Sequence, residues 1–145
     1  MLLEILADGA KTPWWIQNGG DAALASFGVA DPGLIPSEVV RWIAGLPTLF
    51  EDERRFYVHA GFRPGAPGRA SDEHTRLWIR EPFLSADYDF GKHVVHGHTP
   101  LQTLRPDARR RRTNLDTAAV FGGALTAGVF GPDRDTALEY LQVPA

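Results

Sequence analysis

A chain of 145 residues with 43% hydrophobic and 23% charged residues has the size and composition of one globular domain with a sizeable core. Its formal net charge of −3 offers no basic field for nucleic acid or anionic lipid, and the lack of cysteine excludes disulfides and thiolate metal sites. No apolar run approaches the roughly 20 residues of a membrane span, and no basic segment precedes the first apolar stretch. We therefore expect residues 1–145 to form a single cytoplasmic domain with no nucleic-acid or membrane partner.

The first third of the sequence predicts helices. Apolar residues at helical spacing predict a helix over 1–8, and the turn signal further on makes Asp21 the expected cap of a second, short helix. A longer amphipathic helix opens near Ser37, its expected cap residue, and is closed by a proline. We interpret the adjacent Trp14 and Trp15 as packing anchors rather than as a binding platform.

Two charged segments are predicted to be solvated turns. Glu51–Arg55 lies between two β-prone runs, which favours a hairpin tip. Arg109–Arg112 is the one block of like charge, and it lacks the interleaved aromatic residues of a nucleic-acid patch, so we expect a solvated hairpin loop there too. Between these segments the pattern predicts a helix over 72–79. Arg80 follows at its C-terminal end, where a positive charge complements the helix dipole.

The last third of the sequence is β-prone. Residues 113–120, 124–130 and 136–143 predict three strands, separated by Gly-Gly and Gly-Pro-Asp turn signals. We expect these strands to form an antiparallel meander that completes a sheet. Helices in the first part and strands in the second make this an α/β (α+β) protein.

The stretch Lys92–Pro100 carries three histidines, on an apolar run that a glycine interrupts and a proline ends. A strand here places Val94, His96 and His98 on one face, because side chains alternate along a strand. Gly97 then permits a sharp turn at the end of the strand. The alternative interpretation is a loop in which the histidines are ordinary polar groups.

A second run, Phe56–Gly61, has the same form, with His59 followed by a glycine. The separation of 98 − 59 = 39 residues allows one helical excursion and a return to a neighbouring strand. Neutral imidazole is the commonest metal-ligating side chain, so His59 and His98 at neighbouring strand ends suggest a shared metal ion. Two histidines are fewer than the three or four protein ligands of most metal sites.

Four short motifs extend this hypothesis: His-Ala-Gly at 59–61, Trp-Ile-Arg at 78–80, Gly-His-Thr-Pro at 97–100 and Asn-Leu-Asp-Thr at 114–117. Their order resembles the phosphoprotein phosphatase branch of the calcineurin-like metallophosphoesterases. That branch includes bacterial serine/threonine phosphatases and symmetrical dinucleoside tetraphosphatases. One departure is Ala118, where family members usually have glycine.

Three further motifs of that family, Gly-Asp-x-His-Gly, Gly-Asp-x-x-Asp-Arg-Gly and Gly-Asn-His-Glu, do not occur in this sequence. The resemblance therefore implies the C-terminal part of a four-layer α-β-β-α metallophosphoesterase sandwich. In the complete family enzyme, two divalent ions (manganese, or iron with zinc) activate a water for in-line attack on phosphorus. The resemblance makes His59 and His98 ligands of one ion and Arg80 the residue that binds the substrate phosphate.

The function implied by the resemblance is metal-dependent phosphoester hydrolysis of the serine/threonine phosphatase type. Its substrate is a phosphoprotein or, as an alternative, a dinucleoside polyphosphate. Because the remaining ligands are absent, we expect this chain alone to bind metal weakly and to be inactive or nearly so. A non-catalytic binding module, or one half of a split phosphatase with a separate N-terminal half, is the alternative from another class. His96 is expected to be a hydrogen-bonding neighbour of the site, and His74 and His93 to have no role in it.

Overall fold

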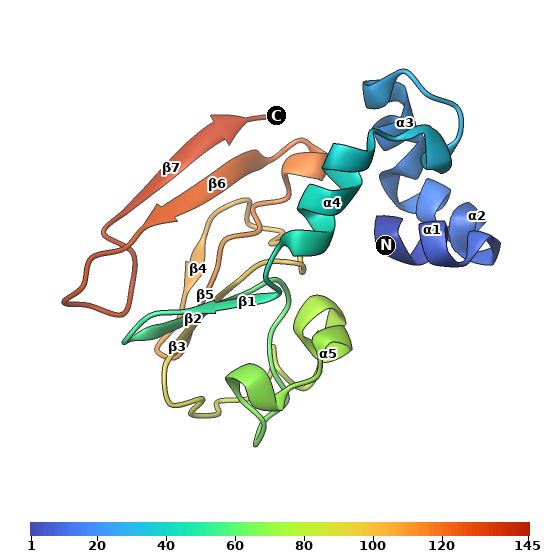
Figure 1. Cartoon of the computed structure of the whole chain (residues 1–145). Helices are drawn as coiled ribbons and strands as arrows, with labels where there is room; N and C mark the ends of the chain where they lie inside the picture. Colours follow the sequence, from blue (N-terminus) through green and yellow to red (C-terminus); the bar gives the residue numbers. More distant parts are fainter. The chain divides into compact units, whose positions relative to one another are not determined.

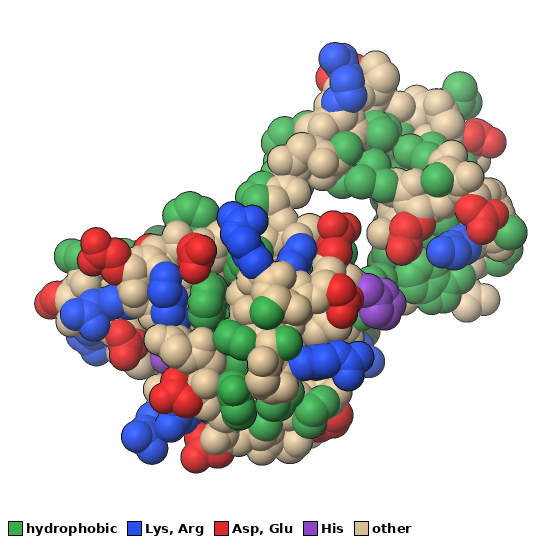
Figure 2. Space-filling view, turned by 60° about the horizontal axis from the view of Figure 1, so that its bottom comes forward, with side chains coloured by type: hydrophobic (Ala, Val, Ile, Leu, Met, Phe, Trp, Pro, Cys, Tyr) green, Lys and Arg blue, Asp and Glu red, His purple; other side chains and the backbone are tan.

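The computed structural model describes all residues 1–145, which form two compact units, Met1–Leu46 and Pro47–Ala145. Each unit is described by itself (Figure 1). No helix in the structure has both the length and the apolarity that crossing a membrane would require. Figure 2 shows one face of the molecule, on which acidic, basic and apolar side chains are interspersed.

The first unit is helical, as the sequence predicts for three of its four helices; the exception is Thr12–Trp15, a segment expected to be an apolar connector. It contains four α-helices: α1 (Leu2–Ala7), α2 (Thr12–Trp15), α3 (Asp21–Phe27) and α4 (Ser37–Gly45). Its core consists of Ile5, Trp15, Leu24 and Ile35. Trp15 packs over Gly20, where a Cβ atom would lie only 2.5 Å from the indole ring. The interpretation of the tryptophan pair is therefore confirmed for buried Trp15, while Trp14 is 40% exposed.

The predicted helix caps in this unit are wrong by one position. Asp21 and Ser37 are the first residues inside α3 and α4, and the preceding residues, Gly20 and Pro36, occupy the cap positions without a side-chain cap bond. Asp21 Oδ1 still accepts a hydrogen bond of 2.8 Å from the Ala22 amide in the first turn of α3. Proline already fixes a backbone angle suited to the start of a helix, so α4 begins without a side-chain cap.

The second unit contains a five-stranded sheet in the order β1-β2-β3-β5-β4. Its strands are β1 (Leu49–Glu51), β2 (Arg55–Val58), β3 (His93–His96), β4 (Asp107–Ala108) and β5 (Arg112–Asn114). The three central strands β2, β3 and β5 are parallel, while β1 and β4 are antiparallel edge strands. Since parallel strands end at the same edge of a sheet, the residues that follow β2, β3 and β5 meet there.

One face of this sheet packs against an aromatic core. Phe56 and Val94 from adjacent strands contact Phe62, Phe83 and Phe90 from the connecting segments. The connection between β2 and β3 contains α5 (Glu73–Trp78), capped by Asp72, whose Oδ1 accepts a hydrogen bond of 2.8 Å from the Thr75 amide. The strands, the helix and their order confirm the expected α/β fold class.

The predicted C-terminal meander is wrong in its pairing. β5 joins the five-stranded sheet as a parallel partner of β3, and residues 115–123 form a loop with a short 3₁₀ turn. Only β6 (Ala124–Val129) and β7 (Glu139–Pro144) pair as an antiparallel hairpin, in a separate two-stranded sheet. Strand propensity alone does not specify which strand will be the partner.

The β6–β7 hairpin exposes the more apolar of its two faces. Leu125 lies opposite Val143, and Ala127 lies opposite Leu141, so these four side chains share one face. Leu125, Leu141 and Val143 are 70%, 52% and 66% exposed. The other face carries Thr126, whose hydroxyl is hydrogen-bonded to Thr117. Antiparallel sheets usually turn their polar face to water, so this arrangement is inverted.

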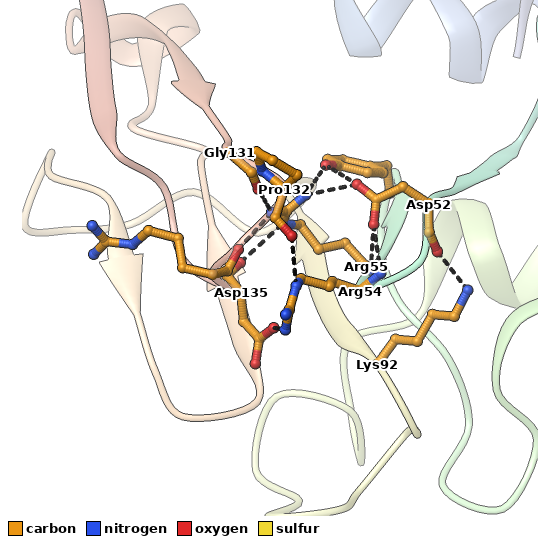
Figure 3. Close-up of polar contacts among 9 residues, drawn as sticks. Asp52, Arg54, Arg55, Lys92, Gly131, Pro132 and Asp135 are labelled. Carbon is orange, nitrogen blue, oxygen red and sulfur yellow. Dashed lines mark hydrogen bonds and ion pairs between the residues drawn. The ribbon is translucent and has the colours of Figure 1, made fainter.

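The charged turn Glu51–Arg55 is only partly solvated, which corrects the sequence-based expectation (Figure 3). Arg55 is 3% exposed. Its guanidinium forms an ion pair with Asp52 at 2.6 Å and donates hydrogen bonds to the carbonyl oxygens of Gly131, Arg134 and Asp135. Arg55 therefore connects the β1–β2 turn with the β6–β7 loop.

The arginine block is also divided between solvent and interior. Arg109 and Arg110 are exposed, as predicted for a hairpin loop. Arg112 is 8% exposed, and its guanidinium donates to the carbonyl oxygens of Leu84 and Ala86. The expectation of a fully solvated loop is wrong at Arg112, because this residue begins β5 and its side chain points into the unit.

Candidate metal and phosphate site

His59 and His98 lie together at the carboxyl ends of two adjacent parallel strands. His59 directly follows β2, and His98 lies two residues beyond β3. The Gly97 amide donates a hydrogen bond of 2.9 Å to the His59 carbonyl, which joins the two segments. His59 Nε2 and His98 Nδ1 are 3.1 Å apart. The structure thus brings together the two histidines that the sequence singled out.

The turn that presents His98 differs from the expected one. His98 itself has a left-handed backbone conformation, with φ of 66°, while Gly97 does not have a positive φ. The Thr99 amide donates to the Gly97 carbonyl at 2.7 Å and closes the turn. His98 is therefore outside the strand, and its side chain is not the next member of the Val94–His96 face.

Both imidazoles have the electrostatic environment of neutral rings. Loss of solvation lowers the pKa of His59, although the nearby Asp116 carboxylate opposes the shift. Loss of solvation also lowers the pKa of His98, and the charges of His59 and Arg80 add to the effect. A neutral imidazole has a free lone pair, which is the metal-binding form.

The other three histidines have different surroundings. His96 is 4% exposed, its ring packs edge-on against Phe83 at 4.8 Å between centroids, and its Nδ1 donates to the Gly97 carbonyl at 3.2 Å. Burial lowers the pKa of His96 to about 4. His93 is buried at the opposite end of β3, with Nε2 2.8 Å from the Thr113 hydroxyl. His74 is exposed on α5 and stacks on Trp78.

Arg80 follows α5 and is exposed. Its charge is close enough to His98 to lower the pKa of that ring. Trp78, two residues earlier, has its ring 5.6 Å from the His98 ring, centroid to centroid. The end of α5 therefore lies beside the histidine pair, and a phosphate held there would be within the field of Arg80.

Asp116 is the residue of this region to which the sequence analysis gave no role. It lies two residues beyond β5, the third parallel strand, and its charge acts on both His59 and His98. Its own Oδ1 accepts a hydrogen bond of 3.1 Å from the Ala118 amide. The two histidines were found as polar residues just beyond a buried strand. Asp116 has the same position relative to β5, which becomes apparent only when β5 is paired with β3.

A pocket of about 410 Å³ opens at this edge of the sheet. His59, His98 and Asp116 line it together with mostly apolar residues, which include Val58, Val95, Leu115 and Leu125. We call His59, His98, Asp116 and this pocket the strand-end site.

The side chains of the strand-end site are of the types that bind divalent cations, but there are too few of them to hold an ion alone. Two nitrogens that bind one tetrahedral ion at 2.0–2.1 Å lie ~3.3 Å apart, close to the observed 3.1 Å. Without an ion, the same distance is a hydrogen bond between the rings. No group of three or more His, Cys, Asp or Glu residues in the chain is arranged to hold a metal ion.

The same fold occurs in a solved structure, in agreement with the fold class expected from the motifs. A solved structure of a candidate diadenosine tetraphosphatase matches the chain with a TM-score of 0.63 and 21% sequence identity, over 93% of this chain and 64% of that one. A scan against models of protein families finds no match.

Two curated relatives are bis(5'-nucleosyl)-tetraphosphatases named PrpE and designated asymmetrical. The chain is 26% identical over 132 residues to the protein of Geobacillus thermodenitrificans, across 77% of this chain and 53% of the relative. It is 41% identical over 61 residues to that of Halalkalibacterium halodurans, across 42% and 22%. The chain thus spans about half the length of the first relative and a smaller part of the second. These similarities agree with the resemblance of the four motifs to the metallophosphoesterase family.

Proposed function

We propose that this chain supplies His59, His98 and Arg80 to a metal-dependent phosphoesterase site that hydrolyses dinucleoside polyphosphates. The observation that carries the proposal is the separation of 3.1 Å between His59 Nε2 and His98 Nδ1, at the ends of parallel strands. The names of the two PrpE relatives favour a dinucleoside tetraphosphate as substrate over a phosphoprotein. The phosphoprotein alternative is supported by the motif resemblance alone.

In this proposal each residue has one task. His59 and His98 would hold one divalent ion through the lone pairs of His59 Nε2 and His98 Nδ1, and that ion would supply positive charge to the phosphate and a more acidic water. Arg80 donates two parallel hydrogen bonds to non-bridging phosphate oxygens, where negative charge increases in the transition state. The oxygen of a water molecule would form the new bond to phosphorus while that water loses a proton to solvent; the bridging P–O bond on the opposite side would break, and the leaving phosphate would keep the bonding electron pair.

The chain alone is expected to have no more than trace activity. Two neutral imidazoles neutralise none of the charge on two divalent cations, and the chain contains no group of three ligands. The remaining ligands would come from residues with the chemistry of the absent family motifs. A manganese-dependent assay of the purified, monomeric 145-residue chain with diadenosine tetraphosphate checks this directly; robust turnover would contradict the assignment of the site.

The positive test is a chimera in which this chain replaces the matched part of the Geobacillus PrpE protein. We expect manganese-dependent hydrolysis of diadenosine tetraphosphate, and a loss of ~100-fold or more on His59→Asn or His98→Asn, the size of effect seen when a key polar group is removed from an active site. His74→Gln is the matched control, because this exposed histidine lies on α5 outside the strand-end site. A folded, metal-loaded chimera that hydrolyses phosphopeptides but no dinucleotide would refute the substrate assignment.

A further inference from the structure

The carbonyl group of Gly97 accepts two hydrogen bonds that stabilise the turn containing His98. It accepts a hydrogen bond of 2.7 Å from the Thr99 amide and a second, of 3.2 Å, from His96 Nδ1. The amide of the same residue donates to the His59 carbonyl at 2.9 Å. Both ends of Gly97 are thus fixed, and the next residue in the chain is His98.

His98 needs such support because its backbone is left-handed, with φ of 66°. Side chains other than glycine enter this region at a cost, and they remain there when the surrounding contacts over-determine the conformation. If the Gly97–His98 peptide were free to rotate, His98 would relax to the right-handed region. Its ring would then leave the position beside His59.

His96 is itself held firmly enough to act as a support. Its side chain is 4% exposed and packs on Phe83, which is fully buried. Phe83 also covers Gly61, two residues beyond His59, where a Cβ atom would lie 2.4 Å from the phenyl ring. Phe83 therefore contacts both the segment that follows β2 and the last residue of β3, and the imidazole of His96 packs against it.

We propose that His96 is a positioning residue of the strand-end site. The hydrogen bond from its Nδ1 to the Gly97 carbonyl holds the left-handed turn, and the turn holds the His98 ring against His59. The proposal rests on the proposed function, in which the two rings bind one ion. It assigns control over the geometry of the pair to a buried histidine that acts through the turn and that also lines the pocket.

The test compares variants of the 145-residue chain in a His74→Gln background, which removes the exposed histidine. His96→Phe keeps a ring on Phe83 but has no N–H donor, whereas His96→Asn keeps a short N–H donor. His93→Phe is the matched control, since it makes the same change at a buried histidine of the same strand, away from the turn. Zinc affinity is measured by calorimetry, and the nitrogen ligands of bound Cu²⁺ are counted by electron paramagnetic resonance.

We expect the parent to give a two-nitrogen copper spectrum, and His96→Phe to give one nitrogen with zinc affinity lowered ~10-fold or more, as for other residues that orient metal ligands. His93→Phe should match the parent, and His96→Asn should recover most of the affinity. Circular dichroism checks the folding of each variant; His96→Leu is the donor-free substitute if Phe at this position prevents folding.

Two results would overturn the positioning role: parent-like metal binding in folded His96→Phe, or an equal loss in the Phe and Asn variants, which would make ring packing the cause. A different result tests the proposed function. If the parent binds zinc no better than His98→Ala, the same comparison is made in the chimera, which supplies further ligands; equal affinities there would mean that the histidine pair is not a metal site and that His96 has no metal geometry to control.

Discussion

Arg80 is the residue whose substitution best separates substrate binding from metal binding. Its charge reaches His98, yet the guanidinium is exposed at the end of α5. In the chimera, Arg80→Ala should lower kcat/KM for diadenosine tetraphosphate by ~100-fold to 1,000-fold, because a donor to the developing phosphate charge is lost. Arg80→Lys should recover only part of this, since an ammonium group lacks the planar fork of guanidinium.

Metal affinity and the unfolding midpoint should change little in both Arg80 variants. Arg109→Ala, at an exposed arginine of the β4–β5 turn, serves as the matched loss of charge. Steady-state kinetics identical to the parent would remove Arg80 from the mechanism.

His93 predicts how the stability of the chain depends on pH. Burial lowers the pKa of its ring, with the charge of Arg55 adding to the effect and that of Asp135 opposing it. The unfolded chain therefore binds the proton more readily than the folded one below the unfolded pKa of about 6.5. Stability from this group is complete above that pH and is lost as the pH falls through it toward the lower folded pKa.

Urea unfolding at pH 7.5 and pH 5.0 measures this contribution. The free energy of unfolding should fall between the two, by at most ~1.4 kcal/mol per pH unit from His93. His93→Gln should show a smaller decrease than the parent, whereas His74→Gln, at an exposed histidine, should behave as the parent does. Equal decreases in the parent and His93→Gln would show that His93 is not protonated on unfolding.

The residues of the strand-end site were predictable to different degrees. His59 and His98 each follow an apolar run, and such a pattern can be recognised from neighbouring residues alone. Asp116 has the same placement but depends on the pairing of β5 with β3, a contact between distant segments. The sequence did not predict the left-handed conformation of His98, because a positive φ is expected at the neighbouring Gly97 rather than at a histidine.

At the scale of elements, Arg55 is the main connection between the β1–β2 turn and the loop of the β6–β7 hairpin (Figure 3). Arg55→Met should destabilise the chain by ~3–5 kcal/mol, because Asp52 and several carbonyl groups lose their partner. Arg54→Met is the matched control: its ion pair with Asp135 and its hydrogen bond to the Pro132 carbonyl are exposed, so ~1 kcal/mol or less should be lost. Chemical denaturation measures both, and equal effects would contradict the importance of burial.

The same arginine shows why some element contacts could not be predicted. Its acceptors are carbonyl oxygens 76 to 80 residues further along the chain, and a backbone carbonyl is the same in every residue. A charged turn is therefore read as solvated when only its sequence is known. Helices, β2 and β3 were predictable because periodicity and turn residues are local signals, whereas the partner of β5 was not.

Ala118 links a departure in sequence to the conformation of a loop. It has φ of 60° in the segment between β5 and β6, a region that glycine adopts at little cost. The family resemblance places glycine at this position, and in this chain alanine itself adopts the left-handed conformation.

At the scale of the whole molecule, the chain matches only part of its relatives, and the strand-end site contains fewer side-chain donors than most metal sites. The chain spans 53% of the Geobacillus relative and contributes two imidazoles to the strand-end site. A single sequence could predict the fold class and that the two histidines lie together. It could not separate the two candidate substrates, because the motif resemblance is shared by phosphatases of proteins and of dinucleotides.

The outward apolar face of the β6–β7 hairpin has a consequence for the behaviour of the chain in solution. Water in contact with Leu125, Leu141 and Val143 is released when two such faces meet, so association should strengthen with concentration and with warming from low temperature. Sedimentation velocity over a concentration series should show reversible oligomers. Leu141→Thr with Val143→Thr should shift the distribution toward monomer, whereas Gln142→Thr, on the opposite face of β7, should leave it unchanged; a monomer at every concentration would mean that this surface tolerates water.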